Sequence, residues 1–311
     1  MSFFKWKRPS QPAPEWTPFE SLSEYQLFIE HIDKYFSKKN LPYTRHEDAI
    51  IVRDKAWKET QWGLHNLAQI CKQNKRSEWR SIVHDHFEGL QAAMEFEESF
   101  LSQAHDYSYA APFIGIRIYH KGYVAHIGDE ATIKESIADD LVALLVFDFP
   151  HNIINIKPET TIQWNKTNEE LYDMGRANIR QKYPTNIHIE TVNDIKIWFI
   201  QENHLFVANN ALDLHLLSVP TGAHGSFVGI PNRHVVMLYP IDNREVMDAL
   251  HPFIAILQGM YRDGPGSVSD SLYWYNNGQL IRLHYTLEKD ELHFQPTEEF
   301  LVMLENLSPK K

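Results

Sequence analysis

The densest group of potential metal ligands in the sequence is His84-Asp85-His86, with Glu88 two residues further on. Imidazole and carboxylate groups are common zinc ligands, so this group is the first place to look for metal chemistry. On a helix, His84 and Glu88 would share one face, whereas His86 would point about 200° away from His84. Three ligands cannot converge from one such helix, and the single cysteine, Cys71, leaves no cysteine-based zinc site. We therefore expect no metal, and we expect Cys71 to be a small core residue.

Two glycine clusters, Gly222-Ala-His-Gly225 and Gly264-Pro-Gly266, could be phosphate-binding loops. Neither cluster has the Walker spacing or the dinucleotide-binding fingerprint, and Pro265 lacks the amide that a phosphate cradle would use. Ser226 does not lie at a nucleophile elbow, because that motif needs a glycine two residues away on each side. We expect both clusters to be loops and the protein to hold no cofactor.

Asn178 is the first of three candidate ligand-binding residues. It lies on the apolar face of its predicted helix, four residues after Met174 and seven after Leu171. A buried amide must be hydrogen-bonded, so Asn178 would either contact a ligand or tie the helix to a neighbouring loop. The tie is favoured, because most side-chain hydrogen bonds are made with backbone groups.

Arg233 and His224 are the other two candidates. Arg233 lies at a predicted hairpin tip, where its guanidinium could be presented to an anion. The alternative is that Asn232, Arg233 and His234 only satisfy the turn, to which asparagine is well suited. His224 belongs to the first glycine cluster and would matter only in an enzyme whose site no motif reveals.

Two segments of the C-terminal half, 171–180 (LYDMGRANIR) and 225–237 (GSFVGIPNRHVVM), resemble the YtpQ-like family of bacterial proteins of unknown function. That family has a helix ending in an Ala-x-x-Asn-Leu-like segment, followed by a Val-Pro-x-x-x-Val-Leu hairpin. Here Ile179 and Ile230 replace the usual Leu and Val. The family's late small-residue loop before two strands would be residues 267–282. The resemblance carries no activity, so it implies only a fold and a bacterial cytoplasmic setting.

The periodicity of the chain predicts an α+β fold with helices packed on largely antiparallel sheets, because hairpins outnumber strand–helix–strand crossovers. We expect a proline-rich tail over residues 1–18, an α+β domain over 19–149, a linker over 150–164 and a second α+β domain over 165–308. The linker is placed where prolines recur and periodicity is lost.

Some elements are predicted in more detail. Residues 113–119 and 123–127 should pair as a hairpin, residues 99–112 should be irregular, and residues 141–149 should form a buried strand. Thr167 and Glu170 form a capping box that begins a helix. Further hairpins are predicted at 187–200, 227–239 and 272–285.

Charge and hydropathy exclude several partners. The net charge is −11, with 30 Lys and Arg against 41 Asp and Glu, and an acidic chain repels phosphate backbones, so we expect no nucleic-acid partner. No stretch approaches 18 uncharged apolar residues, so we expect no membrane span. A single cysteine fits a reducing compartment, and we expect the protein to be cytoplasmic. The oligomeric state stays open.

The leading prediction is a non-catalytic binding or protein-interaction module, with another protein as its partner, because catalytic motifs are absent and aromatic residues are frequent near loops. One alternative is a hydrolase-like enzyme using Asn178, His224 or Arg233. Another is a domain that stabilises a larger assembly. A deep polar cleft holding Asn178 or Arg233 beside a titrating histidine would favour the enzyme, and a flat aromatic patch would favour the interaction module.

Overall fold

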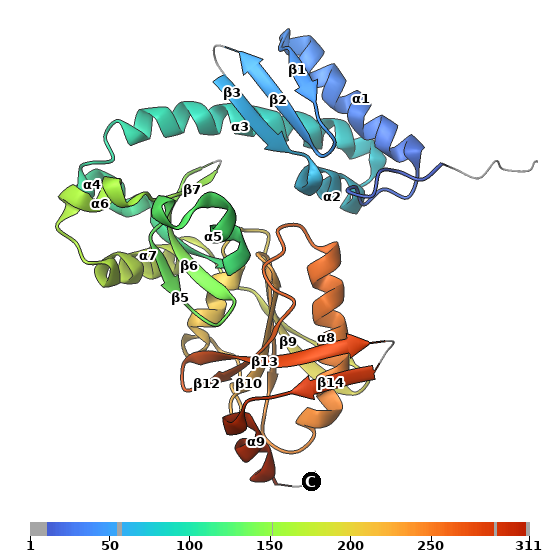
Figure 1. Ribbon diagram of the computed structural model, residues 1–311, viewed down its shortest axis with the longest axis vertical. Helices are drawn as coiled ribbons and strands as arrows, with labels where there is room; N and C mark the ends of the chain where they lie inside the picture. Colours follow the sequence, from blue (N-terminus) through green and yellow to red (C-terminus); the bar gives the residue numbers. More distant parts are fainter. Residues whose placement is uncertain (1–10, 55–57, 151, 289–290, 309–311) are drawn as a thin grey trace, which may run out of the picture. The chain divides into compact units, whose positions relative to one another are not determined.

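The structure is a computed structural model that describes residues 11–54, 58–150, 152–288 and 291–308. Backbone contacts divide the chain into two compact units. The smaller unit comprises residues up to Ser99 together with Pro150–Asn152, and the larger comprises Phe100–Phe149 and the chain from Ile153 onward. Both units combine helices with antiparallel sheets, which confirms the α+β prediction (Figure 1).

This division lies earlier in the chain than the linker expected at 150–164. Much of that interval is structured: it holds β7 (Ile153–Asn155), α6 (Pro158–Thr161) and a 3₁₀ turn that ends at Trp164. The Trp164 ring is buried, and its indole N–H donates to the Ala104 carbonyl at 3.0 Å. The elements of residues 150–164 are too short to show a helical or strand period in the sequence. The interval therefore resembles a linker, although its second half packs into the larger unit.

The smaller unit has a three-stranded antiparallel sheet that shares one aromatic-rich core with its helices. Ser21 begins the first helix, because its hydroxyl accepts from the Glu24 amide at 3.3 Å. Asn40, in the left-handed conformation, ends that helix. The elements are α1 (Leu22–Lys39), β1 (Tyr43–Arg45), β2 (Ala49–Asp54), β3 (Lys58–Gly63), α2 (His65–Gln73), the 3₁₀ turn η1 (Arg76–Glu78) and α3 (Trp79–Leu101).

The prediction that residues 99–112 are irregular is wrong for part of that segment. Helix α3 continues to Leu101, and a short helix α4 (Tyr107–Ala110) follows. The Asp106 carboxylate begins α4 by accepting from the Ser108 amide at 2.8 Å. A four-residue helix has too little length to show a period in the sequence.

A small sheet in the larger unit is centred on β6 (Leu141–Asp148), whose eight residues are all buried, as predicted. β6 pairs with β4 (Ile114–His120) on one side and with β5 (Lys134–Ser136) and β7 on the other. The hairpin predicted over 113–127 is therefore wrong. Residues Lys121–Ile127 form helix α5, which begins where the His120 ring Nδ1 accepts from the Gly122 amide at 3.0 Å.

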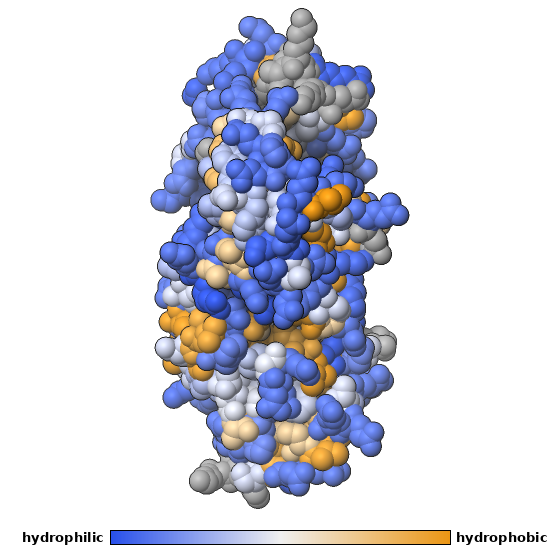
Figure 2. Space-filling model, turned by 90° about the vertical axis from the view of Figure 1, so that its left-hand side faces the viewer, coloured by the Kyte–Doolittle hydropathy of each residue, from blue (hydrophilic) through white to orange (hydrophobic). Residues whose placement is uncertain are grey.

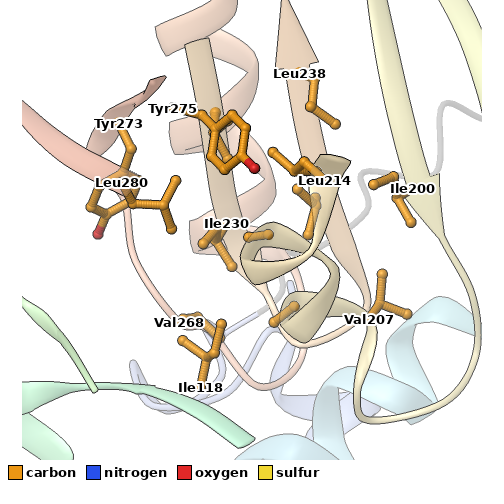
Figure 3. Packing of buried hydrophobic residues seen from close by; sticks show 14 of the residues in the cluster. Ile118, Ile200, Val207, Leu214, Ile230, Leu238, Val268, Tyr273, Tyr275 and Leu280 are labelled. Atoms are coloured by element: carbon orange, nitrogen blue, oxygen red, sulfur yellow. The ribbon is translucent and has the colours of Figure 1, made fainter. Parts of the chain in front are cut away.

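A seven-stranded antiparallel sheet dominates the larger unit, in the order β14-β13-β12-β10-β11-β9-β8, and it contains the three predicted C-terminal hairpins. Helices α8 and α9 share a core with one of its faces. The other face packs against 3₁₀ turns and against Ile118 of β4, which lies beside Val268 (Figure 3). The elements are β8 (Ile187–Val192), β9 (Ile195–Gln201), η5 (Val207–Leu212), β10 (Ser226–Asn232), β11 (Val235–Pro240), α8 (Val246–Asp263), β12 (Leu272–Asn276), β13 (Gln279–Glu288), β14 (Glu291–Gln295) and α9 (Glu298–Glu305).

Helix α7 (Asn168–Lys182) begins at the predicted capping box of Thr167 and Glu170. It packs closely against β4, because glycines face each other at the crossing. A Cβ atom on Gly175 would lie only 2.9 Å from the carbonyl carbon of Gly115. The two glycines thus fix where the helix crosses the strand.

Candidate functional site

The turn between β10 and β11 holds Arg233 in a tightly built setting. Its backbone amide donates to the Gly266 carbonyl at 3.0 Å, and the Asn232 side chain accepts from the His234 amide at 3.0 Å. Gly266 has φ +71°, and a Cβ there would lie 2.5 Å from the Arg233 Cζ atom. The second glycine cluster is therefore a loop, as predicted, and it makes room for the Arg233 side chain.

Arg117 lies on β4, in the small sheet, and its positive charge acts on Arg233. Its Cζ atom is 4.8 Å from the centre of the Tyr119 ring. Tyr119 stacks in turn on Tyr123 of α5, with ring centres 4.4 Å apart and planes within 8° of parallel. We call Arg117, Tyr119, Tyr123 and Arg233 the paired-arginine site. The packing of Ile118 into the core of the large sheet brings β4 to this place.

The electrostatics of the paired-arginine site are unbalanced. Burial, and then the positive charge of Arg117, lower the pKa of Arg233 to about 10, while Tyr119 opposes that change. The Nε atoms of both arginines are buried without a hydrogen-bond partner. Within the described residues no carboxylate pairs with either side chain; the arginines that do form ion pairs include Arg76, Arg176, Arg180, Arg262 and Arg282. Two like charges therefore act on each other in a partly buried region, and no described side chain supplies a counter-ion.

A histidine does lie beside Arg233, but its surroundings are not those of a catalytic base. Burial, and then the charge of Arg233, lower the pKa of His234 below its ordinary value. The ring interacts with the backbone of Glu202 and His204. No carboxylate or hydroxyl among the described side chains forms a hydrogen bond with this ring, so nothing orients it toward a nucleophile.

Asn178 makes the loop tie that the sequence favours. Its side-chain nitrogen donates to the carbonyl oxygens of Ala111 and Ile114, each at 2.8 Å. Both protons of the amide are used, and they join α7 to the segment that leads into β4. The hydrogen bonds account for a polar residue on this face of the helix.

His224 is joined to its surroundings through its backbone. Its amide donates to the Ile241 carbonyl, and its own carbonyl accepts from the Trp274 indole, both at 2.9 Å. His224 precedes β10 and Arg233 follows it, so a strand about 20 Å long separates the two. The three candidate residues therefore do not converge on one site. Two grooves in the larger unit, of about 600 Å³ and 620 Å³, are lined by other residues.

The larger unit contains a second buried charge, Asp140, that the sequence analysis missed. One carboxylate oxygen accepts from the Tyr273 hydroxyl at 2.8 Å, and the other accepts from Ser271 at 2.7 Å and Ser269 at 3.4 Å. The Arg282 Nε atom lies 3.5 Å away. Asp140 comes from the turn before β6, and its partners come from β12, β13 and the loop before them, so this Asp140 network joins the two sheets. Every acceptor is engaged, which makes the network structural.

Arg117 was also missed, although the sequence contains a signal for it. In IGIRIYH (residues 114–120) an arginine interrupts a strand that is otherwise apolar until its end. A charge inside such a strand needs a partner or a ligand. The partner it meets is another arginine far along the chain, and that pairing is visible only in the fold.

The residues considered for metal chemistry have ordinary roles. Glu88 accepts from the Tyr35 hydroxyl at 3.0 Å and pairs with Lys39 at 2.6 Å. Among the described residues, no three His, Cys, Asp or Glu side chains are placed to share a metal ion. Cys71 is completely buried, as predicted, and burial raises the pKa of its thiol to about 12, which makes it a poor nucleophile.

Comparison of the chain with protein-family models, with curated proteins and with solved structures finds no significant match. The site therefore has to be interpreted from its own geometry. Across the described residues, no helix combines the length and the apolar character needed to cross a lipid bilayer.

Proposed function

We propose that this protein is a non-catalytic binding module that holds an oxyanion, a carboxylate or a phosphate group, between Arg117 and Arg233. The observation that carries this proposal is that two partly buried arginines act on each other without a carboxylate partner among the described residues. An anion placed between them would remove the repulsion. Guanidinium groups bind such oxyanions through paired N–H donors, which gives directional as well as electrostatic binding.

The setting of Arg233 supports a binding role. Its backbone is tied to Gly266, and the glycine leaves space for the guanidinium, so the side chain is positioned before a ligand arrives. Such preorganisation reduces the entropy lost on binding. Tyr123 is 40% exposed and could extend the contact to a ligand larger than a single ion.

The hydrolase-like alternative has less support. His234 has no described carboxylate to orient it, and Asn178 and His224 lie in separate structural ties. A protein partner would supply the oxyanion from an acidic side chain. Figure 2 shows mostly hydrophilic residues on the face in view, with hydrophobic ones gathered in patches. We also propose the YtpQ-like family and a bacterial cytoplasmic setting, on the sequence resemblance and the single cysteine.

The test is calorimetric titration of the full chain with three probes: inorganic phosphate, succinate and a glutamate-rich peptide, each at matched ionic strength. We expect saturable one-site binding by at least one probe. Binding should also stabilise the folded protein, by about 2.7 kcal/mol when the ligand concentration is a hundred times Kd. The melting temperature should therefore rise. The probe that binds best distinguishes a small anion from an acidic protein segment.

Two variants locate the binding. Arg117→Met and Arg233→Met keep the apolar stem but remove the charge, and each should weaken binding about tenfold or more. Arg233→Lys should give an intermediate affinity, because an ammonium keeps the charge but loses the paired donors. The control is Arg262→Met, an exposed arginine paired with Asp263, which should bind as the wild type does. Equal binding by all variants, or no binding by any probe, contradicts the proposal.

A further inference from the structure

Strand β8, at one of the two edges of the seven-stranded sheet, forms a second surface, independent of the paired-arginine site. Strand β8 pairs with β9 in an unbroken six-residue register, and no described strand lies on its other side. The sequence IHIETV (residues 187–192) contains no lysine or proline. Charged side chains, above all lysine, together with proline and bulges usually keep an edge strand from pairing with another chain. Of these devices β8 has only one acidic side chain, Glu190.

The side chains of β8 alternate in a self-complementary pattern. Ile189, in the middle of the strand, is a large apolar residue that is 53% exposed. His188 and Glu190 flank it on the opposite face of the sheet, with side chains 37% and 60% exposed and 3.6 Å between Nε2 and Oε1. Apolar, basic and acidic groups are thus all accessible along one unpaired edge.

We propose that β8 pairs antiparallel with β8 of a second copy of this chain, about a twofold axis that passes midway between the two Ile189 residues. In this register Ile189 faces Ile189 of the second copy, and His188 faces Glu190 twice, once on each side of the axis. Directly opposed residues on one face are the pairs that stabilise antiparallel strands. A twofold axis makes each such contact occur twice.

Neighbouring registers fit less well. The nearest register that still brings the outward-facing backbone groups of the two strands together places Ile187 opposite Ile189 and His188 opposite His188. That register keeps apolar contacts but loses both histidine–glutamate pairs. Only the register centred on Ile189 matches histidine with glutamate on both sides of the axis, and this argues for a second copy over an unrelated strand. A contact made by one short strand buries less area than the roughly 1,200 Å² of a stable interface, so the dimer should dissociate readily.

Sedimentation velocity of the full chain, from micromolar to millimolar concentration, tests the association. We expect the average mass to rise with concentration toward a dimer. Ile189→Lys should abolish the rise by placing two charges opposite each other on the axis. Ile162→Lys is the matched control, because Ile162 is also an exposed isoleucine of the larger unit, and this variant should associate as the wild type does.

A charge exchange tests the register. Glu190→Lys should raise the dissociation constant about fivefold or more, since two symmetric pairs change at once. Adding His188→Glu to Glu190→Lys restores opposite charges across the axis and should recover the association. Three results would overturn the proposal: a monomer at every concentration, a dimer unaffected by Ile189→Lys, or a double variant that associates no better than Glu190→Lys.

Discussion

The two hydrogen bonds of the Asn178 side chain show how much a partly buried amide contributes to the stability of the fold. Asn178→Leu removes the side-chain donor to the Ala111 and Ile114 carbonyls. We expect a loss of about 1–3 kcal/mol in the free energy of unfolding, measured by urea denaturation. Asn178→Asp keeps the shape but cannot donate when ionised, so it should also destabilise.

The matched control for Asn178 is Gln181→Leu, an amide removed from an exposed position of the same helix. This change should alter the unfolding free energy by no more than about 0.5 kcal/mol. If Asn178→Leu unfolds at the same urea concentration as the wild type, then the two hydrogen bonds contribute nothing and the tie is not structural.

Two charged side chains of the larger unit, the buried Asp140 and the partly buried Arg233, differ in how their charges are compensated. Asp140 accepts hydrogen bonds from three hydroxyl groups and lies near Arg282, so residues of the fold compensate its charge. Arg233 meets another cation, Arg117, and no described carboxylate. A compensated buried charge fixes the packing of two sheets. An uncompensated one lowers stability until something binds it, which is why we place the ligand at the arginines.

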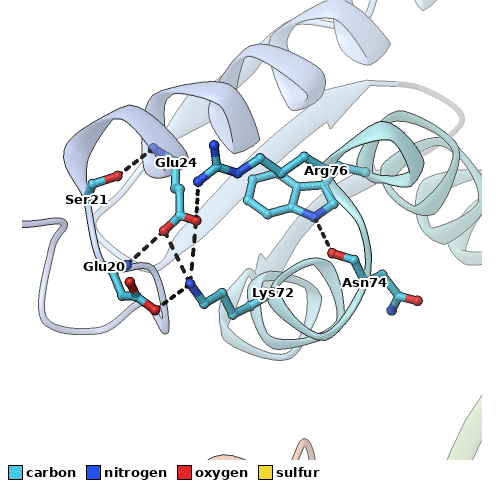
Figure 4. Close-up of polar contacts among 7 residues, drawn as sticks. Glu20, Ser21, Glu24, Lys72, Asn74 and Arg76 are labelled. Atoms are coloured by element: carbon cyan, nitrogen blue, oxygen red, sulfur yellow. Dashed lines mark hydrogen bonds and ion pairs between the residues drawn. The ribbon is translucent and has the colours of Figure 1, made fainter.

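Three elements of the smaller unit are joined by one acidic residue. Glu24, in the first turn of α1, is 7% exposed, and its carboxylate accepts from Arg76 at 2.6 Å and lies 3.4 Å from Lys72 of α2 (Figure 4). Burial by itself raises the pKa of this carboxyl. The hydrogen bonds from Arg76 and from the Glu20 amide, together with the charge of Lys72, outweigh burial and bring the pKa below its ordinary 4.5.

This pKa predicts how the stability of the Glu24 cluster depends on pH. Because the folded pKa lies below 4.5, the stabilisation is present above about pH 4.5 and is lost as pH falls through the folded value. Glu24→Gln should therefore reduce the free energy of unfolding at pH 7 by about 1–3 kcal/mol. The difference from the wild type should shrink as the pH is lowered from 5 toward 3.

Urea denaturation followed by circular dichroism at several pH values measures this difference. Glu78→Gln is the control, since Glu78 is exposed in the neighbouring 3₁₀ turn, and this variant should follow the wild type at each pH. A Glu24→Gln deficit that stays constant with pH would mean that the charge of Glu24 is not what stabilises the contact.

The charge of the whole molecule limits which anions the paired-arginine site can accept. Two arginines can hold one oxyanion, but a nucleic acid would extend its phosphates over the surrounding surface of a chain with net charge −11. Tight binding to nucleic acid needs many Lys and Arg contacts to phosphates. We therefore expect no detectable binding of single-stranded DNA or RNA at physiological salt.

Fluorescence anisotropy with a labelled oligonucleotide measures this, and a basic single-stranded-DNA-binding protein is the positive control. Submicromolar affinity with a steep salt dependence would show that the fold gathers a basic surface that the linear sequence hides. Binding of the small anions with no binding of the oligonucleotide would agree with a site that accepts one oxyanion.

Most of the local structure can be predicted from the sequence, because caps, turns and periodicity depend on residues close together in the chain. Examples are the Thr167–Glu170 capping box, the buried strand at 141–148 and the C-terminal hairpins. The prediction was wrong at 121–127, where His120 begins a helix while β4 takes its partner, β6, from further along the chain.

The candidate site, by contrast, forms only when the chain folds. Arg117 lies on β4 and Arg233 in the turn between β10 and β11, more than a hundred residues apart in the chain. Asp140 meets its partners across a similar separation. No local rule connects such residues, because each is an ordinary polar residue in its own segment. Packing brings these charges together and excludes water, and both effects change the free energy of the charged forms. Burial and the neighbouring charge therefore decide which of these residues needs a ligand.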